Sequence, residues 1–398
     1  MEELFAKRMQ IAKASEIREI LKLTTKPEII SFAGGLPAPE LFPVEEMIEV
    51  SSKVLKTMGR EALQYGPTEG YLPLRNHIVA HMKERGIDVD ADNILILSGS
   101  QQGLDFSGKV FLDEGDVVFC ESPSYLGALN AFRSYLCNFK AVETDENGMN
   151  LEDLERKIEE AKAEGHTPKF VYVIPDFQNP SGKTWSLERR KGLYEIAVKH
   201  NIAIVEDNPY GALRFEGEVI PPIKSLDKDG RVVFLGTFSK TFTPGLRLGW
   251  VAASKELLAK FNIAKQAADL QASTISQREL SVFLDNYDFN GHVKHLIEVY
   301  KGRRDLMVET MKRTFPESAK YVIPQGGLFM WVELPEKIDT KKLLEKAIAK
   351  KVAFVPGASF FPDGNVHNCM RLNYSNMTEE RIVEGIERLA ELLKEELK

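Results

Sequence analysis

The feature that most limits the fold of this chain is a repeated alternation of short apolar runs with helical patterns between residues 45 and 290. The apolar runs stand at 94–97, 117–120, 170–174, 202–205, 232–235 and 250–253. Amphipathic stretches separate them, for example at 103–112, 151–164 and 187–200. The runs lack in/out alternation, so each predicts a strand that is buried on both faces. Strands of this kind, spaced by helices, predict an α/β domain with a mostly parallel sheet flanked by helices.

The two ends of the chain have a different texture from this central part. A long helical pattern at 292–314 leads to strand patterns at 328–333, 353–355 and 370–373, with further helices at 340–351 and 378–398. The start of the chain predicts an amphipathic helix around 15–23 and then a Gly/Pro-rich loop that contains Gly34 and Gly35. We therefore expect an N-terminal arm and covering loop at 1–44, a large domain at 45–290 and a small α+β domain at 291–398.

Composition narrows the class of protein. The formal net charge is −7, from 52 basic and 59 acidic residues, which predicts no nucleic-acid surface. No apolar run approaches the roughly 20 residues that a membrane span needs, and the first residues carry no signal-peptide pattern. Cys120, Cys137 and Cys369 have no paired spacing, and the histidines lack partners for a metal site. We expect a cytoplasmic protein that holds no metal and binds neither membrane nor nucleic acid.

The most informative segment follows the run at 232–235. Lys240 ends this predicted strand, at the edge where open α/β sheets bind ligands. The hydroxyls of Thr237 and Ser239 and the guanidinium of Arg247 suit a phosphate dianion. An amine beside a phosphate clamp is what pyridoxal 5′-phosphate (PLP) needs, because one group condenses with its aldehyde and the others hold its tail. Taken alone, Lys240 is equally well explained as a surface charge.

Four other strand ends carry candidate residues, and each has an ordinary alternative. Ser100 and Gln101 open a helix whose N-terminus suits an anion, although a plain helix cap is commoner. Tyr125 could stack on a flat ring or pack in the core. Asn179 could donate to a phenolic oxygen or mark a turn. Asp207 ends a buried strand, which is costly unless the acid meets a cation such as a protonated pyridine nitrogen, or caps a helix.

Together these segments are specific. The pattern consists of Asn179-Pro180-x-Gly182, Asp207-x-Pro209-Tyr210 and Ser239-Lys240-x3-Pro244-Gly245-x-Arg247-x-Gly249. It resembles the fold type I PLP-dependent aminotransferases of class I and II, and the resemblance extends from Gly34-Gly35 to Arg371. Thr237 stands where relatives often carry serine, and it keeps the hydroxyl.

The resemblance implies a role for each residue. Lys240 would carry the cofactor covalently, and Asp207 would keep its pyridine nitrogen protonated. Asn179 and Tyr210 would bond the ring oxygen, Tyr125 would stack on the ring, and Tyr65 would be lent across a homodimer interface. The phosphate would be held by Ser100, Gln101, Ser239 and Arg247. Lys240, Asp207 and Tyr210 are the expected catalytic residues.

The resemblance also suggests the substrates. Arg371 ends a strand in the small domain, where the family binds the substrate α-carboxylate, although a surface salt bridge is the ordinary alternative. The arm and the loop with Gly35 and Leu36 look like the branch of 2-aminoadipate and kynurenine aminotransferases. There Arg18 would meet a side-chain carboxylate or swing away for an aromatic group; otherwise it is an exposed helix arginine. Gly35, Leu36 and Asn179 complete the expected substrate-binding residues.

The leading hypothesis is a PLP-dependent aminotransferase of acidic and aromatic amino acids that uses a 2-oxo acid such as 2-oxoglutarate by a ping-pong mechanism. The same cofactor could support β-elimination or decarboxylation, because PLP supplies the chemistry and the protein selects the bond. A ligand-sensing regulatory domain is a remote alternative, since the roughly 30 residues ahead of the Gly-Gly loop predict no helix-turn-helix module.

Overall fold

The fold is seen in a computed structural model, which describes residues 4–11, 20 and 26–398. A seven-stranded sheet forms the centre of the larger lobe, in the order β2-β10-β9-β8-β7-β3-β4. Its strands are β2 (Ile94–Leu97), β3 (Val117–Glu121), β4 (Asn138–Val142), β7 (Pro168–Val173), β8 (Ala203–Asp207), β9 (Val232–Thr237) and β10 (Gly249–Ala252). Neighbouring strands are parallel except β10, which is antiparallel to both β2 and β9. The mostly parallel α/β sheet predicted from the sequence is therefore confirmed.

Six strands of this sheet coincide with the predicted apolar runs, and the seventh was missed. Strand β4 lies at the sheet edge beside β3, and only Val142 of its five residues is buried. Asn138 and Lys140 interrupt its apolar character. A strand at the edge of the sheet, with four of its five residues not fully buried, lacks the continuous apolar pattern that revealed the others.

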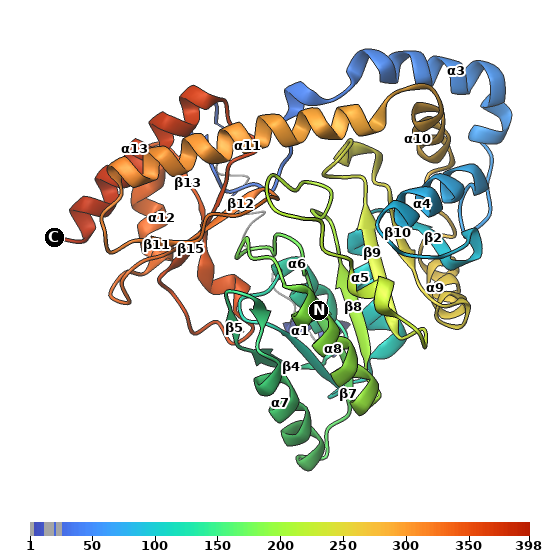
Figure 1. Cartoon of the computed structure of the whole chain (residues 1–398), viewed down its shortest axis with the longest axis horizontal. Helices are drawn as coiled ribbons and strands as arrows, with labels where there is room; N and C mark the ends of the chain where they lie inside the picture. Colours follow the sequence, from blue (N-terminus) through green and yellow to red (C-terminus); the bar gives the residue numbers. More distant parts are fainter. Residues whose placement is uncertain (1–3, 12–19, 21–25) are drawn as a thin grey trace.

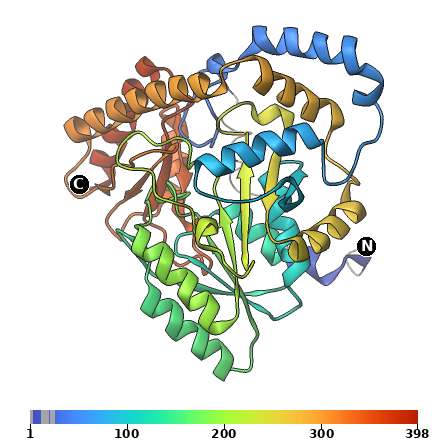
Figure 2. The same ribbon diagram turned by 45° about the vertical axis from the view of Figure 1, so that its right-hand side comes forward.

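Helices cover both faces of the sheet, which explains why its strands do not alternate. In β3, Val118 and Cys120 pack in a core that includes residues of α5 (Ser100–Phe111), α6 (Leu126–Arg133) and α9 (Lys255–Ala268). Val117 and Phe119 face the other way, toward α7 (Leu151–Ala163) and α8 (Leu187–His200). Helix α4 (Leu72–Glu84) lies across the same sheet in Figure 2, where α7 and α8 run side by side below it. The remaining helices of this lobe are α3 (Val44–Ala62) and α10 (Thr274–Asn286), which pack together.

The smaller lobe is built on a four-stranded sheet in the order β11-β12-β15-β14. The strands are β11 (Lys320–Tyr321), β12 (Phe329–Glu333), β14 (Val355–Pro356) and β15 (Cys369–Asn373), with helices α12 (Thr340–Ala349) and α13 (Glu379–Glu396). The long helix α11 (Phe289–Thr314) reaches from α10 to α13 across the top of Figure 1. Shorter elements are α1 (Lys7–Ile11), β1 (Ile30–Ser31), β5 (Thr144–Asp145), β6 (Gly148–Met149) and β13 (Val352–Ala353).

The segment after the arm is fixed to this smaller lobe. Strand β1 pairs in parallel with β13, and the Asn373 N–H donates to the Phe32 carbonyl at 2.8 Å. These bonds place the Gly34-Gly35 loop beside β15. The predicted arm helix at 15–23 lies outside the described residues except for Ile20, and the division at residues 44 and 290 stays a prediction.

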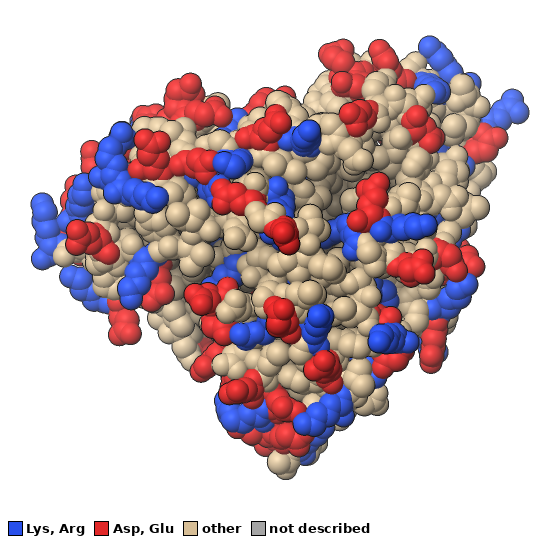
Figure 3. Space-filling view, viewed as in Figure 1, with Lys and Arg blue, Asp and Glu red and all other residues tan. Residues whose placement is uncertain are grey.

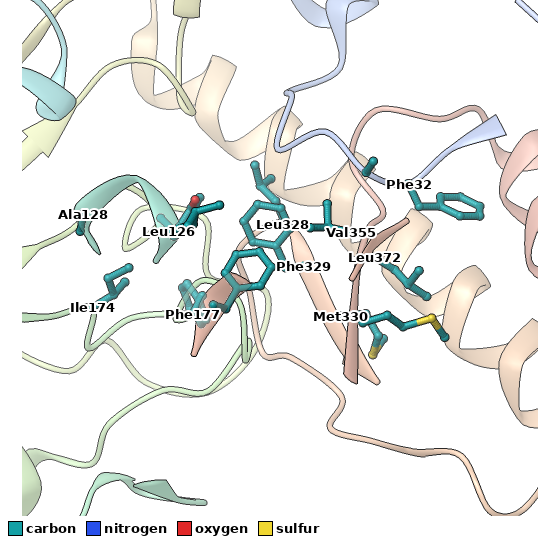
Figure 4. Close-up of a cluster of buried hydrophobic side chains, with 14 of the residues drawn as sticks. Phe32, Leu126, Ala128, Ile174, Phe177, Leu328, Phe329, Met330, Val355 and Leu372 are labelled. Atoms are coloured by element: carbon teal, nitrogen blue, oxygen red, sulfur yellow. The ribbon is translucent and has the colours of Figure 1, made fainter. Parts of the chain in front are cut away.

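A shared apolar core joins the two lobes. Figure 4 shows Phe177 from the loop after β7 beside Phe329 at the start of β12, with Leu126, Ile174 and Leu328 around them. Gly327 has φ +74°, and a Cβ there would lie 2.7 Å from the Cβ of Phe177. Glycine thus allows the two segments to touch. The contact holds the loop that carries Asn179 against the sheet that carries Arg371.

The surface carries charges of both signs. Figure 3 shows lysine and arginine intermingled with aspartate and glutamate over the visible face. Within the described residues, no helix is both long and apolar enough to span a membrane.

Candidate active site

A cavity of about 250 Å³ lies where the loops after five parallel strands meet the smaller lobe. Because parallel strands end at the same edge of a sheet, the segments after β2, β3, β7, β8 and β9 converge there. The cavity is lined by Gly35, Ser100, Gln101, Tyr125, Ile174, Asn179, Asp207, Pro209, Tyr210, Thr237, Ser239, Lys240, Pro244, Arg247, Phe329 and Arg371. The structure thus brings together eleven of the fourteen site residues predicted from the sequence.

Lys240 brings an amine into this cavity. It follows β9, and its Nζ donates a hydrogen bond to the Gly35 carbonyl at 2.7 Å. Burial lowers the pKa of Lys240 from 10.5 to about 8, and the nearby charges of Arg371 and Arg247 act in the same direction. An amine with such a pKa is neutral in a useful fraction near pH 8, which is what a nucleophile or a general base needs.

Hydroxyl and guanidinium donors gather at the end of the cavity formed by β9 and α5. Thr237 and Ser239 lie with their hydroxyl oxygens 3.0 Å apart. Arg247 reaches the loop after β2, where its Nη2 lies 3.4 Å from the Ser98 carbonyl oxygen. A Cβ on Gly99 would lie 2.4 Å from this Nη2, so only glycine leaves room for the guanidinium.

The helix α5 begins at Ser100 beside this guanidinium. Its first N–H groups and the positive end of its dipole add to the donors of Thr237, Ser239 and Arg247. The neighbouring Gln101 side chain donates to the Gly127 carbonyl at 3.0 Å and lies 3.4 Å from the Tyr125 hydroxyl. This end of the cavity can therefore hold a phosphate, with an aromatic ring next to it.

Asp207 lies deep in the cavity at the end of β8. Its side chain is buried, and Oδ2 accepts a hydrogen bond from the Tyr172 hydroxyl at 3.0 Å. Its other oxygen, Oδ1, is buried and has no hydrogen-bond partner among residues 4–11, 20 and 26–398. Burial raises the pKa of Asp207 to about 7, and the bond from Tyr172 opposes the rise. A buried carboxylate oxygen that lacks a donor is suited to a cationic or N–H group of a ligand.

Asn179, Tyr210 and Arg371 form a chain of polar contacts on the opposite wall. Nη1 of Arg371 donates to Asn179 Oδ1 at 2.8 Å, and Nδ2 of Asn179 donates to the Tyr210 hydroxyl at 3.3 Å. The second guanidinium nitrogen, Nη2, donates to the Ala33 carbonyl at 2.9 Å. Hydrogen bonds thus connect the arginine expected at the substrate carboxylate with the two residues expected at the ring oxygen.

The guanidinium of Arg371 is also held by two aromatic rings. Its Cζ lies 4.1 Å from the ring centre of Phe329 and 5.1 Å from that of Phe360. Arg371 is only 2% exposed, and its Nε has no hydrogen-bond partner. Burial lowers the pKa of Arg371 to about 10. The alternative of a surface salt bridge is therefore wrong, because this arginine is buried, with no acidic partner in the part of the chain that the structure describes, and it suits an anionic group of a ligand.

Two predicted site residues, Leu36 and Tyr65, do not line the cavity, and a third cannot be placed. Leu36 is 46% exposed, and its carbonyl accepts a bond from Ser375 at 2.7 Å. Tyr65 is 78% exposed on the outer surface. Arg18 lies outside the described residues. The roles predicted for these residues stay predictions.

Some cavity residues escaped the sequence interpretation. Ile174 and Phe329 line the cavity, and the Tyr172 hydroxyl donates a hydrogen bond to Asp207. Gly326 and Gly327, which precede Phe329, could have indicated close packing at this point, as Gly34 and Gly35 did for the covering loop. Tyr172 was hidden inside a predicted strand, where an aromatic residue is expected in any case.

The donor set fits PLP. The cofactor has an aldehyde for an amine, a phosphate for clustered donors and a ring nitrogen for a carboxylate. One cavity holds a match for each of these groups. Lys240 supplies the amine, Thr237, Ser239 and Arg247 supply the clustered donors, and Asp207 supplies the unpartnered carboxylate oxygen Oδ1. Bound there, PLP would supply an electron sink for negative charge at the carbon next to the substrate amino group.

Comparison with known proteins agrees with this geometry. The family described as aminotransferase class I and II matches residues 28–389. The chain is 48% identical to aromatic-amino-acid aminotransferase 1 of Thermococcus litoralis, over 100% of this chain and 95% of that protein. It is 41% identical to 2-aminoadipate transaminase of Thermus thermophilus, over 98% and 97%.

A solved structure extends the match to three dimensions. The kynurenine aminotransferase of Pyrococcus horikoshii, in complex with PMP, superimposes with a TM-score of 0.95 at 44% identity, over 100% of this chain and 98% of that one. The fold type I architecture expected from the resemblance is thereby confirmed. The chain belongs to the class I and II aminotransferases, enzymes that move an amino group from an amino acid to a 2-oxo acid.

Proposed function

We propose that this chain is a PLP-dependent aminotransferase in which Lys240 carries the cofactor and Asp207 meets its ring nitrogen. The observation that carries the proposal is the pairing, in one cavity, of a part-buried amine with a buried carboxylate, one oxygen of which has no hydrogen-bond partner among the described residues. Ser100, Gln101, Ser239 and Arg247 hold the phosphate. Asn179 and Tyr210 bond the ring oxygen, and Tyr125 covers the ring.

Lys240 has a second role once the substrate has displaced it from the cofactor. With PLP bound, its amine, whose pKa is lowered to about 8, would be placed to take the proton from the substrate Cα and to give one back. Asp207 stabilises positive charge on the ring nitrogen throughout, and Tyr210 bonds the ring oxygen. Transfer of the amino group would then take place in two half-reactions, with a second 2-oxo acid as acceptor, which is a ping-pong cycle.

Arg371 binds the substrate α-carboxylate in this proposal. Three of its five N–H donors remain after the bonds to Asn179 and Ala33, and the aromatic rings fix the guanidinium plane. A planar carboxylate can therefore be gripped at two points. Gly35 and Asn179 lie on the same side, and Leu36 belongs to the loop that covers it.

The substrates we propose are acidic and aromatic amino acids, with 2-oxoglutarate as acceptor. Support comes from the relatives, which are named for aromatic amino acids, 2-aminoadipate and kynurenine. Arg18 would select between the two classes by meeting the distal carboxylate or moving aside. A β-lyase or decarboxylase is less favoured, since the named relatives are aminotransferases; acceptor-independent release of pyruvate and ammonia would reveal a lyase.

We also propose a homodimer with shared active sites. An apolar groove beside the cavity includes Phe42, Val44, Met47, Ile48 and Leu246, and exposes Val44 to 57% and Ile48 to 60%. Tyr65, the tyrosine expected to be lent across a dimer interface, is likewise exposed, at 78%. Hybrid dimers made from Lys240→Ala and Tyr65→Phe subunits test this, because only crossed sites restore one complete centre. A cytoplasmic location stays a prediction.

The experiment for the whole proposal is a visible-absorbance titration of the purified protein with a panel of amino acids. PLP bound through Lys240 absorbs in the visible range, and substrates change that band in the order of their reactivity. The Lys240→Ala variant is the control and should show neither the band nor transamination. Wild-type turnover in that variant would overturn the assignment of Lys240.

A further inference from the structure

The two oxygens of the Asp207 carboxylate have unequal surroundings. Oδ2 accepts a hydrogen bond from the Tyr172 hydroxyl at 3.0 Å, whereas Oδ1 is buried with no hydrogen-bond partner. We propose that Tyr172 is a positioning residue, which holds Asp207 by Oδ2 and so turns Oδ1 toward the ring nitrogen of the cofactor. The inference rests on the proposed function, because it concerns the group that Asp207 meets.

The register of the sheet explains how Tyr172 reaches Asp207. Tyr172 on β7 lies opposite Val205 on β8 in a parallel pair. Val205 and Asp207 are two residues apart and therefore share one face of the sheet, so Tyr172 stands on that face one step below the carboxylate. A tyrosine side chain is long enough to cover this step and end at Oδ2.

Packing leaves the Tyr172 ring little freedom. The side chain is fully buried, and its ring meets that of Phe132 edge-on at 5.5 Å between centres. Cys120 is its partner on the other neighbouring strand, β3. Burial raises the pKa of Tyr172 far above its usual range, so the hydroxyl keeps its proton and acts as the donor. The position of Oδ2 is thereby fixed by a rigid core residue rather than by a loop.

The bond also favours the charged form of Asp207. The buried carboxyl already tends to hold its proton, and the Tyr172 hydroxyl opposes this tendency. Without that hydroxyl, both carboxylate oxygens would be buried without a donor, and a group left unsatisfied in this way is costly. We therefore expect the hydroxyl to strengthen the attraction between Asp207 and a protonated ring nitrogen.

The test removes only the hydroxyl, in Tyr172→Phe. The protein freed of cofactor is titrated with PLP and, separately, with 1-deaza-PLP, in which carbon replaces the ring nitrogen. We expect PLP to bind about tenfold more weakly than to the wild type, the scale of one hydrogen bond to a charged group. Binding of 1-deaza-PLP should change less than twofold, because that analogue has no nitrogen for Asp207 to meet.

Two further variants separate a specific effect from loss of packing. Tyr374→Phe is the matched control, because the Tyr374 hydroxyl is also fully buried and donates to the Gly326 carbonyl at 2.8 Å. It should leave the affinity for PLP unchanged. In an Asp207→Asn background, Tyr172→Phe should have less than twofold effect, since coupled residues are non-additive.

The outcomes are distinct. A tenfold loss for PLP with no loss for 1-deaza-PLP supports the inference. Equal losses for both ligands, or equal affinity of Tyr172→Phe and the wild type for PLP, overturn it while the proposed function stands. Failure of the wild type itself to bind PLP overturns the proposed function, and the inference with it.

Discussion

The substrate carboxylate site can be tested by replacing Arg371 with lysine, which keeps the positive charge and removes the planar fork. The guanidinium now bonds Asn179 at 2.8 Å and Ala33 at 2.9 Å and still has donors for a ligand. A lysine ammonium is a point charge and cannot replace these bonds together with a two-point grip on a carboxylate. Loss of one charge-assisted bond to the substrate, with one buried acceptor left unpaired, costs about 3 kcal/mol or more. This predicts a fall in kcat/KM of at least roughly 100-fold.

The assay compares an amino acid with the amine that lacks its α-carboxylate. For an aromatic or acidic amino acid, Arg371→Lys should lower kcat/KM by that factor, while the visible spectrum of bound PLP stays that of the wild type. The single-turnover reaction of the amine, which has no carboxylate to lose, should change by less than threefold or so. A fall below tenfold for the amino acid, or equal falls for amino acid and amine, would contradict the carboxylate role.

Three other predictions concern the remaining polar groups. Asp207→Asn should retain PLP weakly and lose most transamination, measured as initial rate; normal rates would remove Asp207 from the ring nitrogen. In the cofactor-free protein, Lys240→Met should raise the unfolding free energy at pH 7 by roughly 3 kcal/mol, since burial lowers the Lys240 pKa from 10.5 to about 8. Below pH 8 the wild-type lysine is charged, and folding must bury that charge, so the stability gained by the variant should fade as pH rises from about 8 to 10.5. Denaturant unfolding at pH 7 and 10.5 checks this prediction. An equal gain in unfolding free energy at both pH values would argue against it. Arg18→Ala should lower kcat/KM for 2-aminoadipate more than for an aromatic amino acid, and equal losses would reject the selecting role.

The sequence was most informative where strands are buried on both faces. The runs around Ile94, Val117 and Val232 are continuously apolar because helices cover both sides, and their ends lead directly to Ser100, Tyr125 and Lys240. Once these strands are placed in one parallel sheet, their ends meet at the same edge of the sheet, and no other feature of the sequence is needed to predict this. Edge strand β4 escaped the same reasoning because Asn138 and Lys140 interrupt its apolar run at the less buried edge of the sheet.

The contacts that shape the site could not be predicted in this way. The stacking of Arg371 between Phe329 and Phe360 depends on how β12 and the segment after β14 pack beside β15 in the smaller lobe, which no local pattern encodes. The bond from Tyr172 to Asp207 depends on the register between β7 and β8. Register is fixed by packing across strands that lie far apart in the sequence. Tyr65 is exposed and does not line the cavity of its own chain, so the role proposed for it would need a partner chain.

The central claim is a covalent bond between the Lys240 amine and the aldehyde of PLP. Borohydride reduces such a bond to a stable secondary amine, and digestion followed by mass spectrometry locates the modified residue. The account predicts a phosphopyridoxyl group on the peptide that contains Lys240, and its absence from the Lys240→Ala variant treated in parallel. An unmodified Lys240 peptide from protein that had been saturated with PLP, or the adduct on another lysine, would contradict the account.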